Sequence, residues 1–226
     1  MKILAIESSG KVASIAVYRD GLIEYEESLG GQLTHSQILM PMVERALEAC
    51  GYRCENMDAF AVNIGPGSFT GLRIGICSAN AMGMAWDRPV IGVDSLRVLA
   101  ANISAFDGWV CPMIDARNDQ VYAGLYSVGP GLPEEQQALF SGSVNEWIES
   151  LPAGNKIFLG DGAVAQRAVL QNRFGEVLTP MAHCMEHRAA SLAVLAADKF
   201  EKGELAAEAM PLYLRKSQAE RMLENG

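Results

Sequence analysis

The chain has 226 residues, half of them apolar, and its 18 basic and 27 acidic residues give a formal net charge of −9 at pH 7. A chain of this size buries enough apolar surface to fold without disulfides or a structural metal ion. Because nonspecific affinity for nucleic acid comes mainly from Lys and Arg that neutralise phosphates, the acidic balance argues against a protein that binds RNA by itself.

The cysteines and the N-terminus indicate where the protein works. Five cysteines are scattered along the chain without the CxxC spacing of a zinc or redox motif, which is typical of reduced thiols in a reducing compartment. The first apolar stretch, residues 1–6, is too short for a signal peptide, and no run of about 18 apolar residues follows. These features predict a cytoplasmic protein with no membrane span.

Apolar periodicity predicts a first half of three strands followed by alternating helices and strands. Turn signals at Ser9-Gly10 and Asp20-Gly21 separate the first three strands, so we expect an antiparallel meander. Pro41 lies inside the first helical segment and should delay its start or kink it. The order β-β-β-α-β-α-β-α is typical of an α/β protein with an actin-like, ribonuclease-H-like fold. The predicted strands span 2–8, 12–18, 21–28, 59–64 and 89–93, and the predicted helices span 34–50, 69–86 and 95–103.

The second half resembles the first. Residues 6–18 (IESSGKVASIAVY) and 114–126 (IDARNDQVYAGLY) align without gaps as strand, turn and strand. Duplicated halves are how actin-like folds are built, although a chance likeness of two hairpins remains an alternative. A strand at 156–159 and helices near 164–170 and 189–202 complete a shortened copy. We therefore predict an N-terminal subdomain of residues 1–105 and a shortened C-terminal subdomain of residues 106–226.

The strongest local pattern is the glycine-rich stretch of residues 65–75, which lies where a strand leads into a helix. Glycines at this place allow a tight turn and let backbone N–H groups at the helix start face an anion. No Gly-Lys-Ser/Thr follows, and the spacing is not that of a dinucleotide fingerprint. A purely structural turn that begins a buried helix remains the alternative reading.

The same stretch, GPGSFTGLRIG, resembles the hallmark of the TsaB (YeaZ) family. The resemblance extends in family order over nearly the whole chain, through residues 3–9 (ILAIESS), 35–37 (HSQ), 92–96 (GVDSL) and 211–215 (PLYLR). It implies an actin-like (ASKHA) fold and a non-catalytic subunit required for threonylcarbamoyl transfer to adenosine 37 of tRNAs that read ANN codons. The implied partners are a TsaD-like catalytic subunit and a TsaE-like ATPase, with tRNA contacted only indirectly and a homodimer possible.

The resemblance also bears on metal binding. The catalytic TsaD relatives hold a metal through an HxxxH pair on their first helix, whereas His35 is followed four residues later by Leu39. Leucine offers no lone pair, so His35 is expected to be a helix-start residue. His183 and His187 are four apart but lack the HExxH pattern. We predict no metal, no cofactor and no catalytic residue.

Nucleotide binding and independent enzymatic activity form the alternative. Actin-like ATPases cradle phosphates in the first hairpin, here residues 7–10, and hold adenosine at a glycine corner, here residues 159–163. Asp161 would place a carboxylate where a polyphosphate needs donors, which disfavours tight ATP binding. A stand-alone actin-like ATPase or an M22-type peptidase remains the alternative, although three histidines and scattered Ser and Cys give no clear nucleophile and base.

The two long helices of the first half carry more apolar residues than one core contact requires. The first is apolar over an arc of about 200°, roughly twice the usual stripe, and the second is apolar or small on nearly all sides. Gly71, Gly75, Ala79 and Gly83 recur every four residues and would let another helix approach closely. Enclosure by the chain's own fold is the competing explanation. The predicted interface with a TsaD-like subunit, or with a second copy, comprises Leu39, Met42, Val43, Ala46, Gly71, Gly75 and Ala79.

Overall fold

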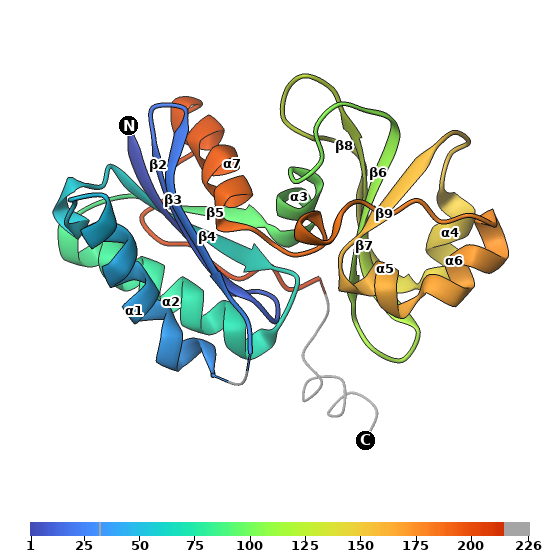
Figure 1. The fold of residues 1–226 in the computed structure, drawn as a ribbon, viewed down its shortest axis with the longest axis horizontal. Helices are drawn as coiled ribbons and strands as arrows, with labels where there is room; N and C mark the ends of the chain where they lie inside the picture. The colour runs from blue at the N-terminus through green and yellow to red at the C-terminus, as the bar shows by residue number, and fades with distance from the viewer. Residues whose placement is uncertain (32, 215–226) are drawn as a thin grey trace.

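A computed structural model describes residues 1–31 and 33–214, so Arg215 of the family-like tail lies outside the described residues. Two α/β lobes stand side by side, each built on its own sheet (Figure 1). The first sheet has the strand order β3-β2-β1-β4-β5, and the second has the order β8-β7-β6-β9. The mixed α/β architecture predicted from the order of the elements is confirmed.

The first sheet begins with the predicted meander. Its five strands are β1 (Lys2–Glu7), β2 (Ala13–Arg19), β3 (Leu22–Leu29), β4 (Ala59–Gly65) and β5 (Val90–Asp94). The first three are antiparallel, with Ile6 opposite Ile15, whereas β4 and β5 run parallel to β1. β1 and β4 are almost wholly apolar and buried because helices cover both faces of the sheet.

Two helices of the first half cover one face of this sheet, and the last helix of the chain covers the other (Figure 1). On the first face, α1 (His35–Ala49) and α2 (Phe69–Trp86) pack on Leu4, Phe60 and Val62. On the second face, α7 (Ala189–Glu201) packs Leu192 and Leu195 on Ile3 and Ala61. The predicted domain boundary at residue 105 stays a prediction. α7 packs on the first lobe, although its residues lie in the C-terminal half of the chain.

The second lobe repeats the strand pattern of the first in shortened form. Its strands are β6 (Phe106–Asp115), β7 (Gln120–Val128), β8 (Glu134–Ser143) and β9 (Lys156–Leu159). β6, β7 and β8 are antiparallel neighbours, and β9 runs parallel to β6 as β4 does to β1. In the described part of the chain, no strand continues this sheet beyond β9 as β5 continues the first.

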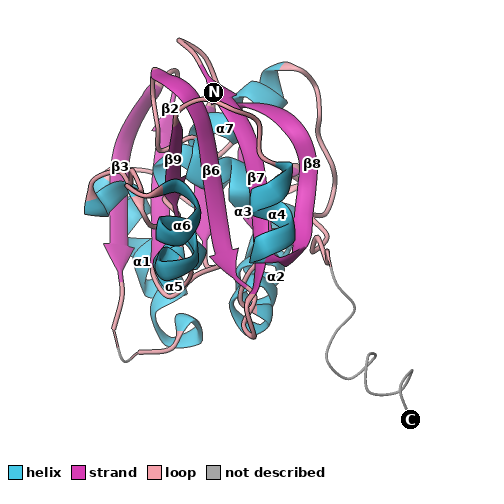
Figure 2. Ribbon diagram, turned by 90° about the vertical axis from the view of Figure 1, so that its right-hand side faces the viewer, coloured by secondary structure: helices cyan, strands magenta, loops and turns pink. Residues whose placement is uncertain are grey.

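Helices also cover both faces of the second sheet. Figure 2 shows one of these faces, with α4 (Val144–Ser150), α5 (Asp161–Ala165) and α6 (Arg167–Phe174) before the strands. The core beneath them is centred on Trp147 and Phe158, whose rings meet edge to face. On the other face, α3 (Ser95–Ala100) packs Leu96 and Leu99 against β6 and β7. Because α3 follows β5 directly, it joins the two lobes.

Two of the helix boundaries predicted for the first half were wrong. α3 ends at Ala100 rather than near residue 103. α1 begins at His35, immediately after Thr34, and continues through Pro41 rather than starting late. Pro41 and Gln37 are both exposed, so water can reach the carbonyl group that proline leaves without an N–H donor. Among the helices of the described ranges, none is long and apolar enough to cross a membrane.

Candidate partner interface and closed cleft

The acidic residue of the first hairpin is sealed inside the protein. Glu7 has no exposed surface, and its Oε1 atom accepts hydrogen bonds from the backbone N–H (2.7 Å) and hydroxyl (2.6 Å) of Ser9. Its Oε2 atom accepts a third from Asn63 Nδ2 (2.6 Å). Asn63 Oδ1 in turn accepts from Ser95 Oγ (2.6 Å) and Gly65 N (2.8 Å). The Glu7 carboxylate is therefore closed off from solvent and ties β1 to β4.

The glycine stretch packs α2 directly against the turn after β1. A Cβ atom on Gly71 would lie 2.1 Å from Ser8 O, and one on Gly75 would lie 2.2 Å from Ser8 Oγ. Ser68 N donates to Ser9 O (2.8 Å), and Ser68 Oγ accepts from Gly71 N (3.2 Å). Both glycines are thus packed against Ser8 of the same chain, which agrees with the interpretation of this stretch as a structural turn that begins a buried helix.

The glycine corner of the second lobe is also a packing joint. A Cβ atom on Gly160 would lie 2.2 Å from Met113 O, and the φ angle of Gly160 is +92°. Asp161 Oδ1 accepts a hydrogen bond from Asp115 N (3.0 Å). This contact fixes the start of α5 on the end of β6.

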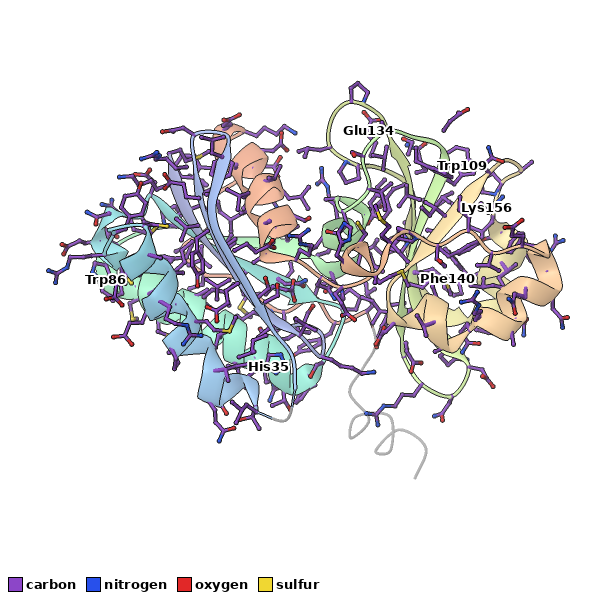
Figure 3. All side chains as sticks on the ribbon, viewed as in Figure 1. His35, Trp86, Trp109, Glu134, Phe140 and Lys156 are labelled. Carbon is purple, nitrogen blue, oxygen red and sulfur yellow. The ribbon has the colours of Figure 1, made fainter. Side chains whose placement is uncertain are left out.

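The three histidines lie in different parts of the chain and differ in solvent exposure. His35 is the first residue of α1, as expected, and Figure 3 shows it and Trp86 at opposite ends of the α1–α2 pair. His183 is exposed in a short 3-10 turn (Ala182–Cys184), whereas His187 is buried just before α7. Within residues 1–31 and 33–214, no three His, Cys, Asp or Glu side chains gather in a way that could hold a metal ion.

Burial raises the pKa values of three ionisable groups, Asp94, Tyr126 and Cys111. Asp94, at the end of β5, accepts a hydrogen bond from Arg97 N (2.8 Å), and burial raises the pKa of its carboxyl group. Burial, and then the charge of Asp94, raises the pKa of the Tyr126 hydroxyl. Burial also raises the pKa of the Cys111 thiol to about 12, so this thiol stays protonated at neutral pH.

All seven residues predicted to form the partner interface lie in the chain's own core. Each is buried, and the five that carry side chains beyond glycine are at most 2% exposed. They hold α1 and α2 on the first sheet and so cannot touch a partner while the helices keep this packing. Contact between these helices and a partner stays a prediction. The seven residues are Leu39, Met42, Val43, Ala46, Gly71, Gly75 and Ala79.

The two helices present a different set of residues to solvent, which we call the outer face. On α2, Cys77, Ala81 and Ala85 are exposed and recur every four residues, and Met84 beside them is 79% exposed. On α1, Met40 is 47% exposed. The helical period could have separated this stripe from the buried one, but apolar residues on almost every side of α2 hid the boundary. The outer face comprises Met40, Pro41, Cys77, Ala81, Met84 and Ala85.

A C-terminal segment, residues 205–214, runs along one flank of α2, and we call it the strap. Ala206 O accepts a hydrogen bond from Val90 N (2.9 Å). Asn80 bonds both backbone groups of Ala209, donating to its O (3.0 Å) and accepting from its N (2.9 Å). The strap includes four residues of the family-like stretch at 211–215, and no local pattern in the sequence predicts that they lie against α2.

Comparisons with known proteins agree on the family. The family model for tRNA N6-adenosine threonylcarbamoyltransferase (TsaD) matches residues 30–223. The tRNA threonylcarbamoyladenosine biosynthesis protein TsaB of Escherichia coli is 33% identical over 97% of this chain and 96% of its own. The TsaB protein of Bacillus subtilis is 34% identical over 77% of each chain. The solved structure of YeaZ from Pseudomonas aeruginosa superposes with a TM-score of 0.79 at 27% identity, covering 94% of this chain and 99% of that one.

These matches and the two-lobed architecture confirm the actin-like fold predicted from the sequence. By the family model, which covers more than half of the chain, and by relatives aligned over most of their length, the chain belongs to the TsaB (YeaZ) family of the TsaD-like proteins.

Proposed function

We propose that the chain is a non-catalytic subunit in the synthesis of threonylcarbamoyladenosine on tRNA. It would be required for transfer of the threonylcarbamoyl group to adenosine 37 of tRNAs reading ANN codons, as a heterodimer with a TsaD-like catalytic subunit. The observation that carries this proposal is the exposed apolar outer face of α1 and α2. The closed hydrogen bonding of Glu7 supports it, because the hairpin that would face a nucleotide offers no free carboxylate.

The outer face fits a partner of the same fold. The TsaD family model matches residues 30–223, so a TsaD-like subunit has counterparts of α1 and α2. Two related chains can pair through like surfaces about a pseudo-twofold axis. The small residues Cys77, Ala81 and Ala85 let a facing helix approach closely, while Met84 and Met40 can adjust to fill the gaps beside it. A second copy of the chain would compete for the same surface.

We infer the remaining partners from the net charge of the chain and from its family. With a net charge of −9, the chain would leave most phosphate contacts to the catalytic subunit, so it would meet tRNA only indirectly. A TsaE-like ATPase would complete the assembly. All of these partners are cytoplasmic in our proposal.

The test introduces a charge into the outer face. Ala81→Glu is expected to weaken binding to the TsaD-like subunit at least about 100-fold, since burying an unpaired carboxylate costs roughly 3 kcal/mol or more. Val164→Glu places the same charge at an exposed position on α5 in the other lobe and should leave binding unchanged. Affinity is measured by titration calorimetry.

The same two variants then enter a tRNA modification assay from which each subunit is omitted in turn. Loss of modification without the chain, and with Ala81→Glu, supports the proposal. Full modification without the chain, or hydrolysis of ATP or peptides by the chain alone, contradicts it.

A further inference from the structure

Hydrogen bonds hold the strap against the first lobe along much of its length. Besides its bonds to Val90 and Asn80, Leu212 N donates to Ile64 O (2.7 Å), next to the glycine stretch. These bonds hold the segment at three points, on β5, α2 and β4, although Ala209 is its one buried residue among those described. The strap is therefore fixed in place mainly by hydrogen bonds to its own backbone groups, two of them with the Asn80 side chain.

At its end the strap places an aromatic ring on the start of α2. The rings of Tyr213 and Phe69 are 6.0 Å apart, and the guanidinium carbon of Arg73 lies 3.8 Å from the centre of the Phe69 ring. Arg73 Nε also makes a long hydrogen bond of 3.5 Å to the Tyr213 hydroxyl. We call Phe69, Arg73 and Tyr213 the aromatic stack.

The aromatic stack remains half open to solvent. Phe69 is 48% exposed and Tyr213 is 51% exposed, even though each contacts its neighbours. Stacked, exposed aromatic and arginine side chains are the residue types that dominate binding energy at protein interfaces. Their rotamers are already held by contacts within the chain, so a partner would order little on binding.

The stack is continuous with the outer face. Phe69, Arg73 and Asn80 lie four and seven residues apart, on the flank of α2 that carries the strap. Cys77 and Met84 follow Arg73 by four and eleven residues, so their side chains occupy the neighbouring row of the helix. A partner that covers Cys77 and Met84 would also meet Arg73 and Tyr213.

We propose that the strap is part of the partner-binding surface, with Tyr213 as an anchor that contacts the TsaD-like subunit directly and Asn80 as a positioning residue that holds the strap on α2. This inference rests on the proposed function. The family model for TsaD extends to residue 223, so the expected partner has a counterpart of this segment as well as of the helices. The partner surface is thus built from both ends of the chain.

The first test measures affinity and stability together. Tyr213→Ala should weaken binding to the TsaD-like subunit at least tenfold and shift the melting temperature of the isolated chain by less than about 2 °C, because Tyr213 is half exposed. Tyr213→Phe keeps the ring and should retain most of the affinity. Met181→Ala is the control. Met181 is 73% exposed and belongs neither to the outer face nor to the strap, so this variant should bind as the unaltered protein does.

The second test releases the strap. Asn80→Ala removes both bonds to Ala209 and should weaken binding, and amide hydrogen exchange should increase across the strap but not in β1 or β4. Combining it with Tyr213→Ala should add little further loss, because both changes remove the same contact.

The outcomes separate this inference from the proposed function. If Ala81→Glu abolishes binding while Tyr213→Ala binds within twofold of the unaltered protein, the strap inference fails and the proposed function stands. If Tyr213→Ala changes self-association and leaves binding of the TsaD-like subunit intact, the occupant is a second copy and the inference is overturned. If Ala81→Glu leaves binding intact, the proposed interface itself is wrong.

Discussion

Ser8 Oγ donates a hydrogen bond of 2.9 Å to the carbonyl oxygen of Gly71, so the turn after β1 lies directly against the first turn of α2. This contact explains why glycine recurs along α2. A close approach of backbone to helix requires residues without a Cβ atom at the points of contact.

Gly75→Leu should therefore destabilise the isolated protein. A Cβ atom at this position would lie 2.2 Å from Ser8 Oγ, so either Ser8 must rotate and lose its hydrogen bond to Gly71 O or the helix must move away from the sheet. We expect the free energy of unfolding to fall by about 3 kcal/mol or more, as for other overpacked cores. Urea unfolding measures the change, and Ala81→Leu on the exposed side of the same helix is the control with little effect. An equally stable Gly75→Leu protein would contradict the close contact.

Glu7→Gln should reduce stability without removing a catalytic group. The new amide would bring an N–H group toward Asn63 Nδ2, which is itself a donor, while Asn63 Oδ1 already accepts from Ser95 and Gly65. One buried donor would lose its acceptor, which costs about 1–3 kcal/mol.

The variant also tests the non-catalytic role. At a temperature where Glu7→Gln is still folded, it should support tRNA modification in the reconstituted complex at close to the normal rate. Circular dichroism verifies folding in the same buffer. A folded variant that binds its partner normally but lacks activity would make Glu7 a participant in the chemistry.

The order of elements in the first half could be predicted from the sequence because each carries a clear local period, whereas β8 and α4 of the second lobe were not predicted. The meander of β1 to β3 has turn residues between short apolar runs, and α2 was predicted at its observed bounds. The end of α3 was missed because its last predicted residues continue an apolar pattern that no glycine or proline interrupts. The packing of α7 on the first sheet could not be read from periodicity, since it joins segments far apart in the chain.

The partner interface was harder to predict, because the sequence of a helix that is apolar on almost all sides does not show which side faces the core and which faces solvent. The spacing of Gly71 and Gly75 predicts a ridge that another helix can approach closely, whereas in the structure Ser8 lies against both glycines. The exposed stripe that includes Ala81 lies on another side of the same helix, which faces solvent. Nothing local in the sequence indicated that Tyr213 lies on Phe69, because the two residues are brought together only by the folded strap.

Acid should weaken one ion pair between β3 and α1. The hydrogen bonds from Arg45, and then from Tyr25, hold the pKa of the Glu27 carboxyl below its usual range. A group whose pKa is lowered in the folded state contributes stability above its unfolded pKa of about 4.3, and this contribution is lost as the pH falls below that value. Unfolding at pH 7 and pH 3 should therefore differ less in Glu27→Gln than in the unaltered protein. Because Arg45 is half exposed, we expect the difference between the proteins to be only about 0.2–1 kcal/mol.

Thiol labelling should distinguish the cysteine of the outer face from the cysteine of the second core. Cys77 is exposed on α2, whereas Cys111 has no exposed surface and burial raises its pKa to about 12. A thiol-specific reagent at pH 8 should therefore modify Cys77 rapidly and Cys111 only after unfolding in urea. Saturating the chain with the TsaD-like subunit should slow the reaction of Cys77 and leave Cys111 unaffected, with a Cys77→Ser variant used to assign the fast phase. Rapid labelling of Cys77 in the saturated complex would place the partner on another surface.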